Sequence, residues 1–241
     1  MTTIRPQSRR DLDPASIAVL ARAAHEMRQP LSAATAAMRL LDGNVDTDTE
    51  RRERACRVLQ RQCARLLRLL DDLLVTATMG RDVTTLNKER IDVDRVLFEM
   101  TEGLQPLAAQ KDQRLDLHLS AQPCWIDADR VRLDQVFSNI LTNSIKYTDP
   151  GGRIWIRAVV IDDYAVVTVG DTGQGIPPDA LPRVFEMFVT SSHHARGGLG
   201  LGLAVARHLV GLHGGSIDVA SEGDGRGTEV TVKLPLLTLR H

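Results

Sequence analysis

The sequence predicts two folded parts, an all-α helical hairpin followed by an α+β sandwich. The chain has 241 residues, which is long for one compact domain and sufficient for two, since a domain takes roughly 100–200 residues. Apolar residues recur in helical steps early in the chain, whereas short β-branched runs alternate with helical stretches from residue 91 onward. We therefore predict an N-terminal segment 1–13, a hairpin 14–80, a linker 81–90 and a second domain 91–237.

The composition is that of an ordinary globular protein. With 43% hydrophobic and 25% charged residues and a net charge of −1, it argues against a disordered chain, a collagen, a disulfide scaffold or a nucleic-acid binder with a broad cationic field. Apolar runs fall short of the ~18 residues of a membrane segment, and residues 1–14 lack the apolar region of a signal peptide. Cys56, Cys63 and Cys124 lack metal-ligand spacing, which fits a reducing compartment. We expect a cytoplasmic chain without a membrane segment.

The first helix is predicted from Pro14 to the turn at Asp42-Gly43-Asn44. Asp13 before Pro14 is a start signal, because a capping side chain followed by proline deals with unpaired N–H groups. Steps of three and four separate the apolar positions, which is the period of a coiled-coil-like seam. These positions are Ile17, Leu20, Ala24, Met27, Leu31, Ala34, Met38 and Leu41.

A second helix with the same apolar period follows and is predicted to end near Gly80. Arginines lie mostly off its seam. Two helices cannot cover the wide apolar stripes by themselves, so we predict that two chains form a homodimer through a four-helix bundle. The second seam comprises Cys56, Leu59, Cys63, Leu66, Leu70, Leu73 and Ala77.

The second domain is predicted to contain five strands and three helices. Consecutive strands are expected to pair as hairpins with the helices gathered between them, which favours an α+β sandwich over a doubly wound parallel sheet. The predicted helices are 94–108, 129–147 and 200–213. The predicted strands are Leu115–Leu119, Ile154–Ile161, Ala165–Val169, Ser216–Ala220 and Glu229–Leu234.

A histidine beside an acidic residue lies in the first predicted helix. His25 is one residue past the seam, so we expect it to be exposed, and Glu26 follows it. Pro30 lacks an N–H for the Glu26 carbonyl and should bend the helix. An unprotonated imidazole nitrogen can attack phosphorus, and a carboxylate can accept the other ring proton. A solvated pair is the alternative for a lone His-Glu, but the proline and the later motifs favour a reactive histidine.

A polar stripe runs along the predicted helix 129–147. Asn139, Asn143, Lys146 and Tyr147 share one face, while the apolar residues of this helix point largely the other way. Amide oxygens suit Mg²⁺, and a lysine suits phosphates. The alternative is an ordinary solvated helix face.

Two glycine-rich segments complete the candidate site. In the first, Asp171 ends a strand and precedes Gly173 and Gly175; its carboxylate can accept a hydrogen bond from an exocyclic amine such as that of adenine, although a plain Asp-Gly turn is the alternative. Residues 176–197 form a long connection of the kind that often acts as a lid. The second segment opens a predicted helix whose free N–H groups suit phosphate. It reads Gly198-Leu199-Gly200-Leu201-Gly202 and does not fit the P-loop or Rossmann pattern.

Taken together, these segments resemble the conserved boxes of the sensor histidine kinases of two-component systems. The resemblance implies the cytoplasmic core of such a kinase, with a HisKA-type dimerisation and phosphotransfer hairpin and a Bergerat-fold ATPase (HATPase) domain. In chain order, His25–Leu31 resembles the H box, Asp134–Thr148 the N box, Asp171–Gly175 the first glycine box, Arg183–Phe188 the F box and Gly198–Leu203 the second glycine box.

The resemblance also implies roles for single residues. His25 would be the phosphoacceptor, Glu26 the general base, Asn139 the Mg²⁺ ligand and Asp171 the adenine partner. ATP would be the phosphoryl donor, and a receiver domain of a separate response regulator would be the acceptor. Further nucleotide contacts would come from Asn143, Lys146, Tyr147, Gly173, Gly175, Gly198, Leu199, Gly200, Leu201 and Gly202.

Two other functions remain open at this point. A gyrase- or chaperone-like ATPase of the same fold would release phosphate without using His25, and a catalytically inactive scaffold would only dimerise and bind partners. The chain also departs from many relatives by placing Gln29 where they carry Thr or Asn, one helical turn after His25. Because glutamine has a longer and more flexible stem, we expect weak or absent phosphatase activity toward the regulator.

Overall fold

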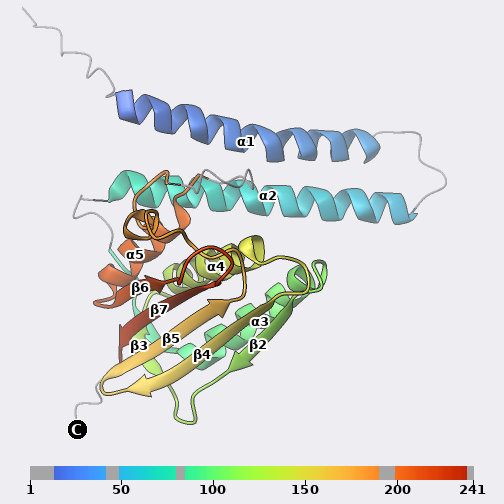
Figure 1. Ribbon diagram of the computed structural model, residues 1–241. Coiled ribbons are helices and arrows are strands. Elements are labelled where there is room, and N and C mark those ends of the chain that lie inside the picture. The colour runs from blue at the N-terminus through green and yellow to red at the C-terminus, as the bar shows by residue number, and fades with distance from the viewer. Residues whose placement is uncertain (1–13, 42–48, 80–84, 190–198, 238–241) are drawn as a thin grey trace, which may run out of the picture. The chain divides into compact units, whose positions relative to one another are not determined.

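The structure is a computed structural model that describes residues 14–41, 49–79, 85–189 and 199–237. The chain divides into two compact units, one up to Asp71 and the other from Asp72 onward. The first unit is a helical hairpin of α1 (Pro14–Leu41) and the larger part of α2 (Thr49–Thr78), which run antiparallel (Figure 1); the last turns of α2 belong to the second unit. The predicted stop signals at Asp42-Gly43-Asn44 and Gly80 lie outside the described residues. None of the described helices has the length and hydropathy needed to cross a bilayer.

The buried face of α1 coincides only in part with the predicted seam. Ala23, Pro30 and Ala37 are buried, each one residue before a seam position. By contrast, Leu31 is 58% exposed and Met38 51% exposed. Ala34 of the predicted seam is buried as well, whereas Ala24 is exposed, so the predicted seam is only partly buried within one chain. One side of that seam faces away from α2.

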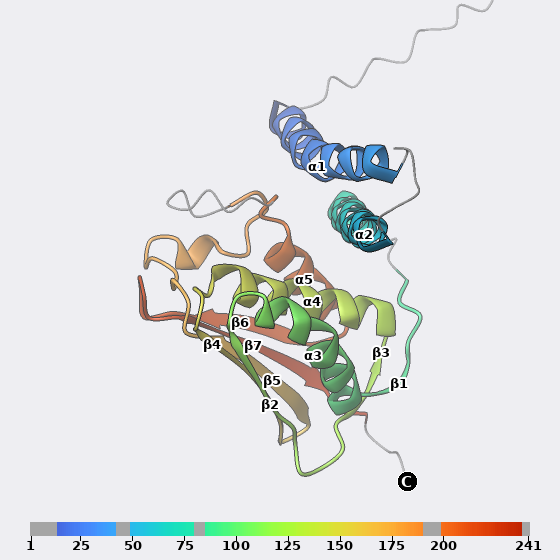
Figure 2. The ribbon, with the colours of Figure 1, turned by 90° about the vertical axis from the view of Figure 1, so that its right-hand side faces the viewer.

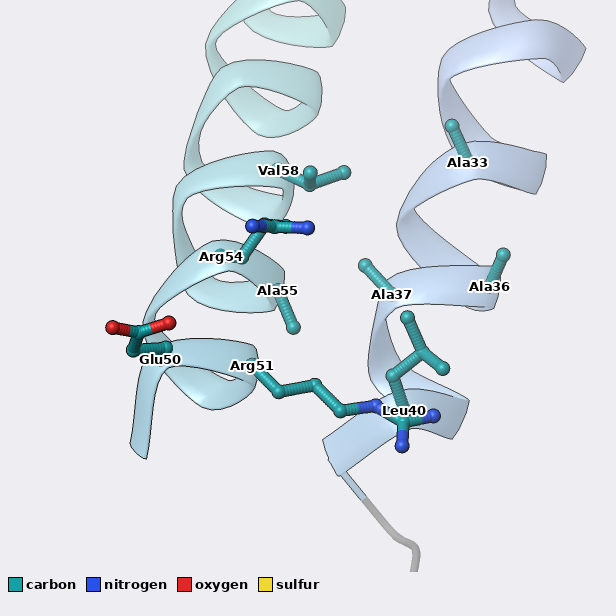
Figure 3. Close-up of a pocket in the computed structure, with 9 residues that line it drawn as sticks. All are labelled: Ala33, Ala36, Ala37, Leu40, Glu50, Arg51, Arg54, Ala55 and Val58. Atoms are coloured by element: carbon teal, nitrogen blue, oxygen red, sulfur yellow. The ribbon is translucent and has the colours of Figure 1, made fainter. Parts of the chain in front are cut away.

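The second helix repeats this division. Ala55 is buried, whereas Cys56, Cys63 and Leu70, spaced seven residues apart on the predicted seam, are exposed. Near the loop end of the hairpin, alanines and Val58 line a hollow of about 560 Å³ between α1 and α2. Figure 3 shows Ala55 and Val58 directed toward α1. The space between the two helices is thus partly unfilled at this end, where Leu40 and the longer side chains of Glu50, Arg51 and Arg54 also line it.

The second unit is a five-stranded sheet with three helices on one face (Figures 1 and 2). The strand order is β2-β4-β5-β7-β6, and a separate two-stranded sheet pairs β1 with β3. The helices are α3 (Val93–Ala109), α4 (Arg130–Tyr147) and α5 (Gly202–Leu212), together with the short 3-10 helix η1 (Leu181–Arg183). The strands are β1 (Glu89–Asp92), β2 (Arg114–His118), β3 (Trp125–Ala128), β4 (Arg153–Ile161), β5 (Tyr164–Asp171), β6 (Ser216–Ala220) and β7 (Thr228–Pro235).

The α+β architecture is confirmed, but the expected run of hairpins is only partly right. Strand β2 pairs with β4 in parallel, with Leu115 opposite Ile154, because β3 and α4 lie between them in the sequence and provide a long crossover. The pairs β4–β5, β5–β7 and β6–β7 are antiparallel. Strand β1 begins inside the predicted linker 81–90, and β3 was not predicted at all. Both strands are only four residues long and contain charged residues, so they lack an apolar period.

The core of this unit lies between the sheet and its helices. Phe137 and Leu141 of α4, Leu209 of α5 and Ile156 of β4 are fully buried or nearly so. Alternate residues of β4 and β5 point to the same face, as the period of a strand requires. This packing fixes α4 against the sheet, and α4 is the element that carries the predicted polar stripe.

Candidate functional site

Helix α4 presents its polar stripe at the edge of the core. Asn139, Asn143, Lys146 and Tyr147 are half-buried, and the apolar side of the helix is buried against the sheet and its neighbours. Lys146 Nζ donates a hydrogen bond to Tyr147 Oη at 2.8 Å and lies 4.4 Å from the centre of the Tyr147 ring. The two-sided pattern read from the sequence thus corresponds to the burial along this helix.

Asp171 is the buried carboxylate of the site. It ends β5 and is only 7% exposed. The Gly173 N–H donates to its Oδ1 at 2.9 Å, and the Ser144 hydroxyl and the Thr228 N–H also donate to the carboxylate. Burial nevertheless raises the pKa of Asp171, because loss of water disfavours the charge more than these donors compensate. Such a carboxylate is suited to a ligand that offers further N–H donors.

Two glycines of the first glycine-rich segment allow close backbone contacts. A Cβ at position 173 would lie 2.6 Å from the Tyr147 carbonyl oxygen, so a larger residue would push this turn away from α4. Gly175 has φ +70°, and a Cβ there would collide with the Gly223 carbonyl. The Gln174 N–H donates to the Tyr147 carbonyl at 3.2 Å. The turn that follows Asp171 is therefore held directly against the end of α4.

The second glycine-rich segment meets α4 farther along the helix. Asn139 Nδ2 donates to the Gly202 carbonyl at 3.2 Å. Leu199 and Leu201 are buried, and Leu201 precedes α5 without a side-chain cap. The first turn of α5 contains no acidic residue, so its N-terminal N–H groups suit an anion. Gly198 lies outside the described residues.

The predicted start of this helix at residue 200 is wrong. Gly200 has φ +68°, a left-handed conformation that cannot begin an α-helix, and its carbonyl accepts a hydrogen bond from the Phe188 N–H at 2.9 Å. A Cβ at position 200 would lie 2.6 Å from the Val189 carbonyl oxygen. The helix therefore begins at Gly202, after the segment has passed close to residues 188 and 189.

These contacts bring the predicted motifs of the second unit to one helix. Asp171 is joined to α4 through Ser144, Gln174 through the Tyr147 carbonyl, and Gly202 through Asn139. Asn143 lies one helical turn from Asn139, between these contacts. Ser144 and Thr228 were not predicted. Thr228 lies opposite Asp171 only because of the β5–β7 register, which a single sequence does not reveal.

The histidine and glutamate of the hairpin are placed differently from each other. His25 is exposed, as predicted, whereas Glu26 is buried. Arg65 of α2 lies within the same unit, with its Nη2 3.7 Å from Glu26 Oε2. Adjacent residues of a helix do not face each other, so the Glu26 carboxylate is directed at α2. Helix α1 continues through Pro30.

Two family models match these two parts of the chain. Residues 16–81 match the His Kinase A (phospho-acceptor) domain. Residues 128–238 match the histidine kinase-, DNA gyrase B- and HSP90-like ATPase. The two matches therefore assign an ATPase-class domain that follows a phospho-acceptor hairpin.

Curated relatives cover both parts in one alignment. The phosphate regulon sensor protein PhoR of Pseudomonas aeruginosa is 33% identical over 215 residues, which are 88% of this chain and 48% of the relative. The sensor histidine kinase RppB of Synechocystis is 30% identical over 222 residues, or 91% of this chain and 49% of the relative. The chain thus spans about half the length of these two relatives.

Solved structures agree in fold. Full-length ShkA in complex with AMPPNP has a TM-score of 0.68 and 29% identity, covering 95% of this chain and 47% of that one. The mycobacterial sensor histidine kinase MprB has a TM-score of 0.56 and 29% identity, covering 63% of this chain and 99% of that one. The chain belongs to the sensor histidine kinases of two-component systems, and its two described parts correspond to the kinase core of that family.

Proposed function

We propose that the chain is an ATP-dependent protein-histidine autokinase that phosphorylates His25 and passes the phosphoryl group to an aspartate of a response regulator. The observation that carries this proposal is the convergence of Asn139, Asp171 and Gly202 on α4 in a chain that also exposes His25 on a separate hairpin. A phosphate-releasing ATPase would need only the first of these features.

In the proposed reaction, an unprotonated imidazole nitrogen of His25 attacks the γ-phosphorus of ATP. An N–P bond forms, the bond from the γ-phosphorus to the bridging oxygen breaks, and ADP leaves with that electron pair. Glu26 accepts the imidazole proton as general base. Because its carboxylate is buried toward Arg65, this step requires the Glu26 side chain to leave Arg65 and turn toward His25.

The nucleotide is proposed to lie along α4. Asp171 accepts a hydrogen bond from the adenine amine, and the N-terminus of α5 faces the phosphates. Asn139 holds Mg²⁺ through its amide oxygen; the amide nitrogen bonds Gly202, and a hard cation prefers oxygen. The remaining contacts are assigned to Asn143, Lys146, Tyr147, Gly173, Gly175, Gly198, Leu199, Gly200 and Leu201. The AMPPNP complex of ShkA supports nucleotide binding.

Two partners follow from the hairpin. Leu31, Leu70 and Leu74 are 58%, 46% and 65% exposed, and a second copy of the hairpin would cover them in a four-helix bundle. The receiver domain of a response regulator would then take the phosphoryl group from His25. We place this kinase core in the cytoplasm, where ATP is available.

Incubation with γ-labelled ATP tests the proposal. We expect label on the protein that is lost in acid and kept in alkali, because a phosphoramidate bond of histidine is acid-labile. Release of inorganic phosphate without protein labelling would instead indicate a gyrase- or chaperone-like ATPase. Nucleotide binding that is undetectable under the same conditions would indicate an inactive scaffold.

A further inference from the structure

A buried imidazole joins α4 to α5 at the ends remote from the Asn139–Gly202 contact. His213 follows α5 directly and is only 4% exposed. The Asp129 N–H donates to its Nε2 at 3.0 Å, and its Nδ1 lies 2.7 Å from the Leu209 carbonyl oxygen. A carbonyl oxygen can only accept, so Nδ1 carries the proton and Nε2 provides the lone pair. The contacts therefore assign a neutral ring of one tautomer.

The surroundings of His213 favour this neutral form. Burial is the largest cause that lowers the pKa of His213 below its ordinary value of 6.5, and Lys88 acts in the same direction. The Leu209 carbonyl and the carboxylates of Asp127 and Asp129 oppose the shift without cancelling it. Protonation would place a hydrogen on Nε2 opposite the Asp129 N–H, and the hydrogen bond between them would be lost.

Asp129 is the residue that starts α4. Its Oδ1 accepts from the Arg132 N–H at 3.2 Å as the N-cap of the helix. Its Oδ2 accepts from the Asn87 N–H at 3.0 Å, which ties the segment before β1 to the same residue. His213 thus holds the backbone of a residue whose side chain holds two other parts of the domain.

Two hydrogen bonds at separate positions therefore connect α4, with its N-cap residue, to α5 and the residue that follows it. One tie is His213 to Asp129, and the other is Asn139 to Gly202. Along α4 the ties are separated by about 15 Å, and along α5 by a similar length, at about 1.5 Å per residue. Because α4 carries the polar stripe and α5 presents its N-terminus, a change in the angle between the helices would move Asn139 relative to Gly202.

We propose that His213 is a positioning residue of the nucleotide site, which sets the angle between α4 and α5 through its hydrogen bond with the Asp129 N–H. This inference rests on the proposed nucleotide-binding function. It assigns to His213 no contact with the nucleotide. Its consequence is that nucleotide affinity depends on an imidazole on the far side of the helix pair, and that acid weakens binding by protonating it.

The test measures the Kd of AMPPNP with Mg²⁺ for the full chain and three variants. His213→Leu removes the acceptor, and we expect the Kd to rise about tenfold or more. His213→Gln keeps a side-chain oxygen for the Asp129 N–H, so its Kd should return to within about threefold of wild type. His208→Leu is the matched control, because His208 is half-buried on the same helix and its Nε2 makes no hydrogen bond with the described residues. Its Kd should stay unchanged.

The pH dependence separates positioning from a general loss of stability. As the pH falls below 6.5, the ordinary pKa of histidine, the affinity of wild type should decline more steeply than that of His213→Gln. Ionisation of the nucleotide affects both proteins equally, so it does not contribute to this difference. Parallel pH profiles, or a folded His213→Leu variant that binds as wild type, would overturn the inference. If His213→Leu does not fold, the pH comparison with His213→Gln decides. Undetectable binding by wild type would instead contradict the proposed function.

Discussion

The hairpin and the ATPase-class unit differ in the size of the hydrophobic side chains that they bury. In the hairpin the buried hydrophobic residues are small, such as Ala23, Ala37 and Ala55, while Leu67 and Leu74 are 62% and 65% exposed. In the second unit Phe137 and Leu209 are completely buried. Full burial of one leucine side chain stabilises a fold by about 1.5–3 kcal/mol. Within a single chain, the exposed leucines of the hairpin do not provide this stabilisation. The difference indicates that the hairpin is half of an interface, whereas the second unit buries a core of large side chains within one chain.

The first prediction concerns Leu70, which lies on the exposed apolar face of the hairpin, and we expect its effect to exceed those of the variants that follow. Leu70→Glu should convert a dimer into a monomer at micromolar concentration, because a charge buried at the interface of the bundle has no partner. Sedimentation measures the association state directly. The matched control is Leu107→Glu, since Leu107 is 42% exposed on α3 of the second unit, close to the 46% of Leu70. Dissociation by both variants, or by neither, would contradict the division of roles.

A second prediction concerns Asp171, the buried carboxylate of the second unit. Asp171→Asn should weaken ATP binding by about tenfold to a hundredfold, the equivalent of about 1–3 kcal/mol for a lost or mismatched partner of a buried polar group. Equilibrium binding to the nucleotide measures this, with Asp179→Asn as a control on an exposed aspartate. Wild-type affinity in the Asp171 variant would refute the adenine role.

The same substitution should have the opposite effect on the stability of the unliganded protein: it weakens nucleotide binding but raises the free energy of unfolding relative to wild type as the pH rises. Because the folded pKa of Asp171 is raised from 3.8, the native state holds its proton more tightly than the unfolded state. Its contribution to the free energy of unfolding is therefore fully present below the unfolded pKa and declines as pH rises through the folded pKa. Residue 171 does not titrate in Asp171→Asn, so the stability of this variant relative to wild type should increase as the pH rises above the unfolded value of 3.8. If the difference in the free energy of unfolding between the variant and wild type stays constant with pH, burial does not raise the pKa of this carboxylate.

The smallest expected effect lies one helical turn from His25. Gln29 is exposed on α1, and its long amide should position water poorly against a phosphorylated regulator, where errors of about 1 Å cost ~100-fold in rate. We expect Gln29→Thr to accelerate loss of phosphoryl from the regulator in the presence of ADP and Mg²⁺. Rapid dephosphorylation by wild type, with no gain in the variant, would show that this side chain does not limit the reaction.

Patterns confined to one element predicted the structure well. The period of α4 gave the correct polar and buried sides, and the isolated turn after Asp171 was found because Asp and Gly carry local chemistry. Features that depend on pairing between distant segments were missed. Thr228 reaches Asp171 through the β5–β7 register, and His213 reaches Asp129 across 84 residues. The predicted seam of α1 is only partly right for the same reason, since its period does not say which side of the stripe faces its own partner helix.

The phosphoacceptor and the nucleotide site are assigned to separate parts of the chain. Comparing His25→Gln with wild type in one experiment tests this assignment, by measuring both protein labelling from γ-labelled ATP and the Kd of AMPPNP. We expect the variant to lose the acid-labile label while its Kd stays within about twofold of wild type. Undiminished labelling, or a loss of nucleotide binding together with the label, would contradict it.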